Sequence, residues 1–165
     1  MKKVSILHII SFTIAIALMI SGCSKKSDES AIKEKLIGYW SISQTFSDNM
    51  TTTQMEGEGE YMADGTSEGI LNFKVSGIGP PVYCTVETLN SWRIEGNYLI
   101  EKPIKVDIIK KKGNPVLLKI LEANFKDSIN KETKALIKHI DDEKCEIFNE
   151  IERVATTLYR LTDEE

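Results

Sequence analysis

The chain has 165 residues, with 21 basic and 25 acidic side chains and a formal net charge of −4. This length fits one domain better than two. The acidic balance argues against nucleic-acid binding, which needs clustered lysine and arginine side chains to neutralise phosphates. Three cysteines and two histidines, with no closely spaced cysteine pair, give no reason to expect a metal site.

The first 22 residues have the organisation of an export signal. Residues 1–3 include two lysines, residues 4–20 carry no formal charge, and an Ile-Ser-Gly-Cys sequence ends at Cys23. A basic start, an apolar run and small residues before the cut are typical of secretory signals. The Ile-Ser-Gly-Cys sequence resembles the lipobox of bacterial lipoproteins. The resemblance implies lipid transfer to the Cys23 thiol, cleavage after Gly22 and acylation of the new amino terminus. An uncleaved membrane anchor is the alternative, although the apolar run is slightly short for a span.

Cleavage after Gly22 would leave 143 residues and, with two lysines removed, a net charge of −6. Two or three acyl chains on Cys23 would hold the protein stably on a membrane. Ser24 follows the cysteine, where an aspartate would resemble the inner-membrane retention signal. We therefore expect delivery to the outer membrane, with the protein facing the periplasm or the cell surface. Residues 23–30 are rich in serine and charge, which predicts a flexible tether.

The rest of the chain, residues 31–165, is predicted to form one all-β domain. Apolar and polar residues alternate with a period of two in several runs, as in half-buried strands. These runs contain Trp40, Ile42 and Phe46; Leu71, Phe73 and Val75; Val82, Cys84 and Val86; and Ile104, Val106 and Ile108. Turn sequences separate the runs, for example at residues 63–66, 95–97 and 141–143. Many short strands at about ten-residue spacing predict a sandwich or a barrel.

Three segments are expected to depart from this strand pattern. Residues 30–37 predict a short helix. Residues 115–125 indicate a second helix, because Asn114 resembles an N-cap and Pro115 occupies the first helical position. One buried strand would fit the same apolar run. Residues 77–81 read Gly-Ile-Gly-Pro-Pro and are expected to form a loop, since two adjacent prolines fit a strand ladder poorly.

Several short motifs resemble those of lipocalins and their bacterial lipocalin-like relatives. The Gly-Tyr-Trp sequence ending at Trp40 is similar to the Gly-x-Trp start of lipocalins, and residues 92–99 resemble a hairpin of lipocalin-like lipoproteins. The resemblance covers residues 38–161. It implies a single antiparallel meander barrel, with Trp40 as an apolar plug at its closed end. It also places Arg160 across the Trp40 ring.

The run over residues 53–62 has two faces of different character. Glu56, Glu58 and Glu60 would form one acidic stripe. Such a stripe could bind a cation or a basic partner, but a solvated outer face of the barrel is the favoured interpretation. Gly57 and Gly59 lie on the opposite face, where they would help the strands bend and close.

Cationic and thiol groups supply the other candidate residues. Residues 110–112 are three lysines, expected to be a solvated loop, with contact to anionic headgroups as the alternative. His139 is the only histidine after residue 22 and cannot by itself hold a metal. Cys84 and Cys145 remain once Cys23 carries lipid. A disulfide between them is favoured in an oxidising compartment, with two buried free thiols as the alternative.

No nucleophile–base pair or phosphate-binding motif is recognisable in the sequence. We therefore expect a non-catalytic protein without a cofactor. A barrel of about eight strands has room for side chains or one small ligand. The leading expectation is a lipid-anchored envelope lipoprotein that binds a small apolar molecule or a protein partner. The alternative is a structural or inhibitory envelope protein with a filled barrel, which would act through its loops.

Overall fold

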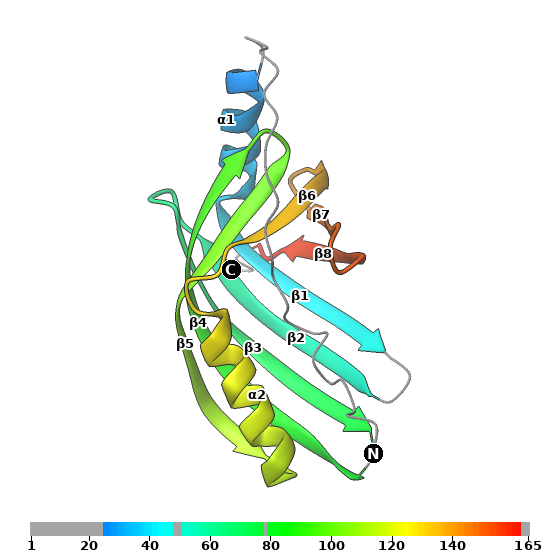
Figure 1. The fold of residues 1–165 in the computed structure, drawn as a ribbon. Helices are drawn as coiled ribbons and strands as arrows, with labels where there is room; N and C mark the ends of the chain where they lie inside the picture. Colours follow the sequence, from blue (N-terminus) through cyan, green and yellow to red (C-terminus); the bar gives the residue numbers. More distant parts are fainter. Residues whose placement is uncertain (1–24, 48–50, 78, 163–165) are drawn as a thin grey trace.

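The computed structural model describes residues 25–47, 51–77 and 79–162. Within these residues, two helices and eight strands follow one another along the chain (Figure 1). The helices are α1 (Lys25–Leu36) and α2 (Pro115–Ser128). The strands are β1 (Gly38–Ser47), β2 (Thr52–Tyr61), β3 (Thr66–Gly77), β4 (Gly79–Glu95), β5 (Tyr98–Lys112), β6 (Thr133–Ile140), β7 (Lys144–Asn149) and β8 (Val154–Arg160).

The eight strands form a closed antiparallel barrel in which each strand pairs with its neighbours in chain order. Residues 40–42 of β1 pair with residues 158–160 of β8 and close the ring. Gln44 extends this seam: its Nε2 donates to Ala155 O at 2.6 Å, and its Oε1 accepts from Thr156 Oγ1 at 2.8 Å. The prediction of a single all-β meander barrel with two helices is confirmed.

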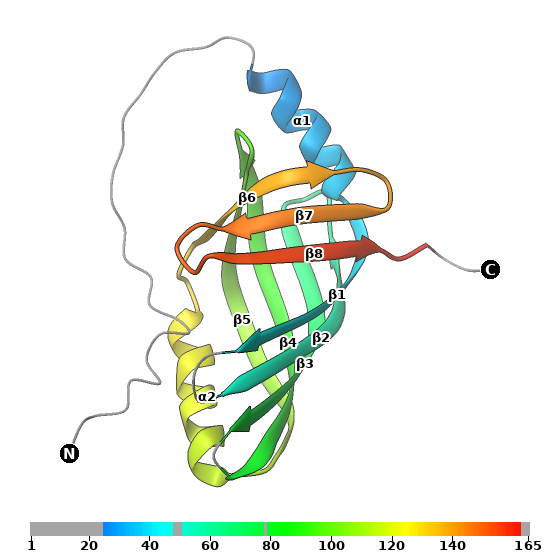
Figure 2. The same cartoon turned by 90° about the vertical axis from the view of Figure 1, so that its right-hand side faces the viewer.

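The barrel is complete at one end only. Strands β2 to β5 contain 10 to 17 residues, whereas β6 to β8 contain 6 to 8. Strand β5 pairs with β6 only over residues 98–101. Beyond that point α2 lies alongside the long strands instead, as Figure 2 shows. The space inside the longer half of the sheet is therefore bordered by a helix where strands would otherwise close it.

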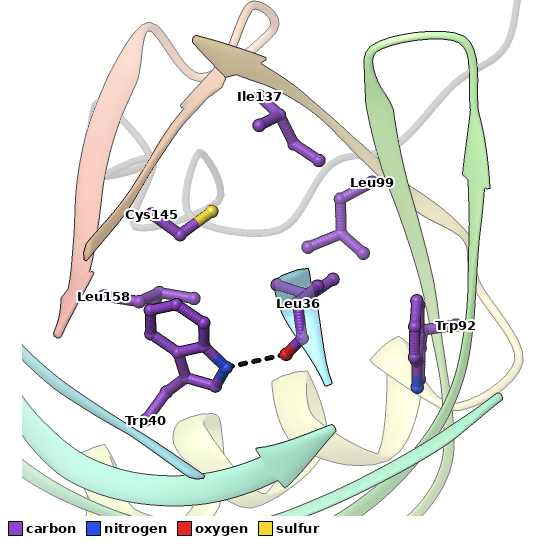
Figure 3. Close-up of a cluster of buried hydrophobic side chains, with 7 residues drawn as sticks. All are labelled: Leu36, Trp40, Trp92, Leu99, Ile137, Cys145 and Leu158. Carbon is purple, nitrogen blue, oxygen red and sulfur yellow. Dashed lines mark hydrogen bonds between the residues drawn. The ribbon is translucent and has the colours of Figure 1, made fainter. Parts of the chain in front are cut away.

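The buried core lies at the end of the barrel that carries α1. One side chain from the helix and six from the strands pack together there (Figure 3). They are Leu36, Trp40, Trp92, Leu99, Ile137, Cys145 and Leu158, none of which is more than 7% exposed. The last turn of α1 thus plugs this end of the barrel, because Leu36 is completely buried among strand residues.

Helix α2 confirms the expectation for residues 115–125 and continues to Ser128. The Asn114 side chain accepts hydrogen bonds from the Val116 and Leu117 amides, so it satisfies two amides that have no partner inside the helix. None of the side chains of α2 is fully buried. Packing against a solid core therefore does not hold this helix in place.

Two local expectations are wrong. Helix α1 begins at Lys25, so residues 25–30 are helical and are not a flexible tether. Glu29 Oε1 accepts a hydrogen bond from Gly96 N at 2.6 Å and fastens the helix to the β4–β5 turn. The segment expected as a loop at 77–81 belongs almost wholly to β3 and β4, with a register shift next to the prolines. Those prolines precede the β4–β5 ladder, which starts at Tyr83, so no amide is missing from it.

Gly57 and Gly59 lie on β2 where β3 approaches closely. Gly59 pairs with Gly69, and Gly57 pairs with Leu71. A Cβ at Gly57 would collide with the backbone of Ile70, and one at Gly59 would lie 2.5 Å from Glu68 O. The expected role of these two glycines in shaping the sheet therefore has a direct steric basis.

Candidate functional site

Trp40 and Arg160 meet at the closed end and bind the last turn of α1. The Arg160 guanidinium carbon lies 4.2 Å from the centre of the Trp40 ring. Trp40 Nε1 donates to Leu36 O at 2.7 Å (Figure 3). Arg160 Nη1 donates to Ile37 O at 3.0 Å, and Nη2 donates to Lys35 O. Three successive carbonyls at the end of the helix are therefore satisfied, and a positive charge sits where the helix dipole favours it.

This arrangement gives the pair a structural role. Trp40 is 2% exposed and belongs to the core. Gly38 has φ of 130°, and a Cβ there would lie 2.5 Å from Arg160 Nη1. A glycine between helix and strand therefore leaves room for the guanidinium group. The contacts expected from the resemblance to lipocalins are present, and they seal one end of the barrel.

A cavity of about 360 Å³ lies inside the barrel between this sealed end and α2. All eight strands and α2 contribute to its wall. Its apolar lining comes from Ile42, Leu71, Val106, Phe125, Ile147 and Leu158. The Phe125 ring of α2 lies 5.4 Å from the Phe73 ring of β3, so the helix contacts the sheet beside the cavity. The interior of the barrel is therefore not filled by its own side chains.

The polar residues of the cavity include a carboxyl group. Glu101 of β5 lines the cavity, and its Oε1 accepts a hydrogen bond from Tyr61 Oη at 2.8 Å. Asn90 and Ser67 line the same cavity and are joined by a hydrogen bond of 3.2 Å. The Tyr61 ring also packs edge-on against Trp92, with 5.5 Å between ring centres. Tyr61 therefore connects the carboxyl group of the cavity to the aromatic residue Trp92 of the core.

Burial perturbs both members of the Glu101–Tyr61 pair. Burial raises the pKa of Glu101, and the Tyr61 hydrogen bond only partly opposes this change. The pKa of Tyr61 is raised well above its ordinary value, first by burial and then by the neighbouring Glu101 charge. Within the part of the chain that the structure describes, no lysine or arginine forms an ion pair with Glu101. Perturbed, uncompensated groups inside a cavity are a common feature of functional sites.

The acidic stripe lies on the outer face of the barrel. Glu56 and Glu58 are exposed, and Glu60 is half-buried. Glu58 and Glu60 border an outer groove together with Ile70, which is 44% exposed. This is the solvated face that the sequence analysis favoured. Glu58 and Glu60 also contribute to the wall of the cavity beside Gly59 and Gly69.

The three lysines at 110–112 are strand residues, which corrects the expectation of a loop. They form the end of β5 and pair with residues 83–85 of β4. Lys111 Nζ lies 2.5 Å from Glu122 Oε1 of α2, and the three side chains are exposed. The ion pair connects the end of the long strand to the helix that borders the cavity.

The expected disulfide is absent, because Cys84 and Cys145 are free. Cys84 lies on β4 opposite Phe73, whereas Cys145 lies on β7 in the closed-end core. Two strands, β5 and β6, separate β4 from β7 in the barrel. Burial raises the pKa of Cys84 to about 11 and that of Cys145 to about 12, so both remain protonated and unreactive at neutral pH.

His139 lies on the surface of β6, where its Nε2 is 2.6 Å from Asp141 Oδ2. That hydrogen bond is the largest cause of the lowered pKa of Asp141. In residues 25–47, 51–77 and 79–162, no group of three or more histidine, cysteine, aspartate or glutamate side chains could hold a metal ion. His139 therefore takes part in a surface turn, and the barrel cavity remains the candidate site.

The lipid-attachment residue Cys23 and the signal segment 1–22 lie outside the described residues. Among the helices that are described, neither is long and apolar enough to cross a membrane. No protein-family model matches the chain, and no curated protein matches it.

The two cavity residues Glu101 and Tyr61 were not candidates from the sequence. The sequence nevertheless contained a signal for Glu101. Residues 99, 101 and 103 lie on the same face of the strand, and the apolar Leu99 indicates that this face points inward. Burying an acidic side chain on the inward face of a strand costs folding free energy unless a partner compensates its charge, so such a residue is a candidate for function.

Proposed function

We propose that this protein is a lipid-anchored lipoprotein of the cell envelope whose lipocalin-like barrel holds one small, largely apolar molecule. The observation that carries this proposal is the cavity of about 360 Å³ inside the barrel. Small-molecule sites typically have volumes of about 300–1,000 Å³. A protein that acts only through its loops would have no use for an unfilled interior, so the cavity favours ligand binding over the filled-barrel alternative.

The composition of the wall also fits a ligand site. Apolar side chains such as Leu71, Val106 and Phe125 surround most of the space, and a few polar groups gather near Glu101. This is the usual composition of small-molecule pockets, in which apolar walls supply affinity and a few polar groups fix orientation. Helix α2 adds to the proposal because its inward residues are only half-buried, which leaves apolar surface for a guest to cover.

The membrane attachment rests on the resemblance of residues 20–23 to a lipobox. Acylation of Cys23 would attach the barrel to a bilayer through α1, which starts at Lys25 and enters the closed end of the barrel at Leu36. Outer-membrane delivery, with the barrel facing the periplasm or the cell surface, rests on Ser24 at the sorting position.

Fluorescence titration with N-phenyl-1-naphthylamine, a neutral apolar dye, tests the ligand site. We expect saturable binding to the purified protein, lost in Leu71→Trp, because the larger indole would occupy part of the cavity. The matched control is Ile70→Trp, which changes the adjacent, outward-facing residue and should bind like the wild type. Equal dye binding by both variants, or no saturable binding by the wild type, would contradict the proposal. Native mass spectrometry of protein from its own host should also detect a retained small molecule.

A further inference from the structure

Glu101 occupies an unusual position for a carboxyl group. It lies on β5 opposite Trp92, next to the closed-end core, and it lines the cavity. Its own strand places Leu99 and Ile100 among the buried residues. The carboxyl group is therefore surrounded by protein on its strand side and faces open space on its cavity side.

The protein itself does not neutralise this group. The Tyr61 hydroxyl donates to one carboxylate oxygen, and no basic side chain among the described residues pairs with the other. A buried ionised carboxyl is normally paired with a cation, because the loss of its hydration is otherwise uncompensated. Its pKa is raised by burial, as expected for a charge without a counter-ion. Glutamine at this position would avoid that cost while keeping the shape.

We propose that Glu101 is the headgroup site of the cavity and binds the protonated amine of an amphipathic molecule whose apolar tail extends past Leu71 and Val106 towards Phe125. The proposal rests on the function proposed above and adds the chemical class of the ligand. An ammonium group supplies the missing positive charge and several hydrogen-bond donors. The Tyr61 hydroxyl holds the carboxylate in position, and the Asn90 side chain lines the same cavity.

Other headgroups fit this site less well. A carboxylate or phosphate would face Glu101 across a medium of low dielectric, where like charges repel strongly. A hydroxyl could donate one hydrogen bond but would leave the charge uncompensated. The acidic net charge of the chain further favours the approach of cations. The site is therefore expected to bind an alkyl amine more tightly than the alcohol or the carboxylate with the same alkyl chain.

Competition for bound N-phenyl-1-naphthylamine by decylamine, decanol and decanoate provides the test. In the wild type we expect decylamine to displace the dye at a concentration at least about tenfold below that of decanol, since charge-assisted hydrogen bonds are roughly twice as strong as neutral ones. Decanoate should be the weakest competitor. In Glu101→Gln the amine should lose this advantage over the alcohol, with displacement by each competitor compared at the dye affinity measured for that same variant. Glu87→Gln is the matched control, because Glu87 is exposed on the neighbouring strand β4.

Each outcome has a distinct meaning. Equal displacement by amine and alcohol in the wild type, or a preserved amine preference in Glu101→Gln, would overturn the proposal. Loss of the preference in Glu87→Gln would overturn it too, because a general surface field would then be responsible. Failure of the wild type to bind the dye would instead refute the ligand cavity itself. Glu101→Ala provides a second variant in which the same loss of amine preference is expected, and circular dichroism confirms that each variant is folded.

Discussion

Replacing Arg160 by alanine removes the side chain that ties β8 to α1. Two hydrogen bonds from the charged guanidinium to Ile37 O and Lys35 O would be lost, each worth about 1.5–3 kcal/mol. The contact with the Trp40 ring adds about 0.5–2 kcal/mol. These gains are partly offset because Arg160 Nε is buried without a partner, which costs about 1–3 kcal/mol. We expect Arg160→Ala to lower the free energy of unfolding by about 2–4 kcal/mol, measured by urea denaturation.

Arg93 provides the matched control. It also makes two ion pairs, with Glu95 and Glu132 at 2.8 Å each, but its side chain is 48% exposed. Exposed pairs contribute about 0.2–1 kcal/mol, so Arg93→Ala should change stability by less than about 1 kcal/mol. The loss of stability in Arg160→Lys should lie between those of Arg160→Ala and Arg93→Ala, because an ammonium keeps the charge but cannot present the two donors of a guanidinium group. If Arg160→Ala costs no more than Arg93→Ala, the satisfied helix carbonyls do not stabilise the barrel as argued.

Three further results are expected. Alkylation under native conditions should modify neither Cys84 nor Cys145, whereas alkylation after unfolding without a reductant should modify both; an unreactive pair after unfolding would show a disulfide. Cys23→Ser should abolish incorporation of labelled fatty acid, and continued labelling would contradict lipidation at that residue. Because burial raises the pKa of Glu101 above its unfolded value, its contribution to stability is full at low pH and is lost as the pH rises through the folded pKa. Glu101→Gln should therefore melt at a higher temperature than the wild type at about pH 8 and lose that advantage towards about pH 4; an advantage independent of pH would refute uncompensated burial.

Local sequence signals predicted most of the architecture. The period-two runs correspond to strands because one face of each strand meets the barrel interior. Asn114 and Pro115 predicted the start of α2 correctly, since capping depends on nearby backbone amides and needs no tertiary information. The Trp40–Arg160 contact could be expected only from the resemblance to a family, because 120 residues separate the two in the chain.

The local errors have a common physical origin. Residues 25–30, 77–81 and 110–112 were expected to be irregular because they are polar, or rich in glycine and proline. In the structure the first and the last of these segments contact parts of the chain outside themselves: Glu29 binds the β4–β5 turn, and Lys111 binds Glu122 of α2. Residues 77 and 79 pair with each other at the turn between β3 and β4. Propensity is a weak guide where tertiary contacts supply the hydrogen bonds.

The disulfide and the headgroup residue were beyond the reach of sequence for different reasons. Pairing of Cys84 with Cys145 was inferred from compartment and number, but strand order separates them around the barrel. Glu101 could have been identified by its phase on β5, yet only the three-dimensional arrangement shows that Tyr61 is its partner and that the space beside it is open. Whether a buried acid is structural or functional depends on what surrounds it.

The cavity and the curvature of the sheet have the same cause. Gly59 and Gly69 pair across β2 and β3, and both line the cavity. A Cβ at Gly59 would lie 2.5 Å from Glu68 O, and one at Gly69 would lie 2.9 Å from Glu58 O, so the adjacent backbone occupies the space that a side chain would need. The strands can approach this closely only where neither carries a side chain, and the wall is consequently bare on its inner surface. Larger residues at these positions would push the strands apart before they filled the interior. The space beside Glu101 therefore arises from the close approach of β2 and β3 at their glycines, and it does not require loose packing of the core.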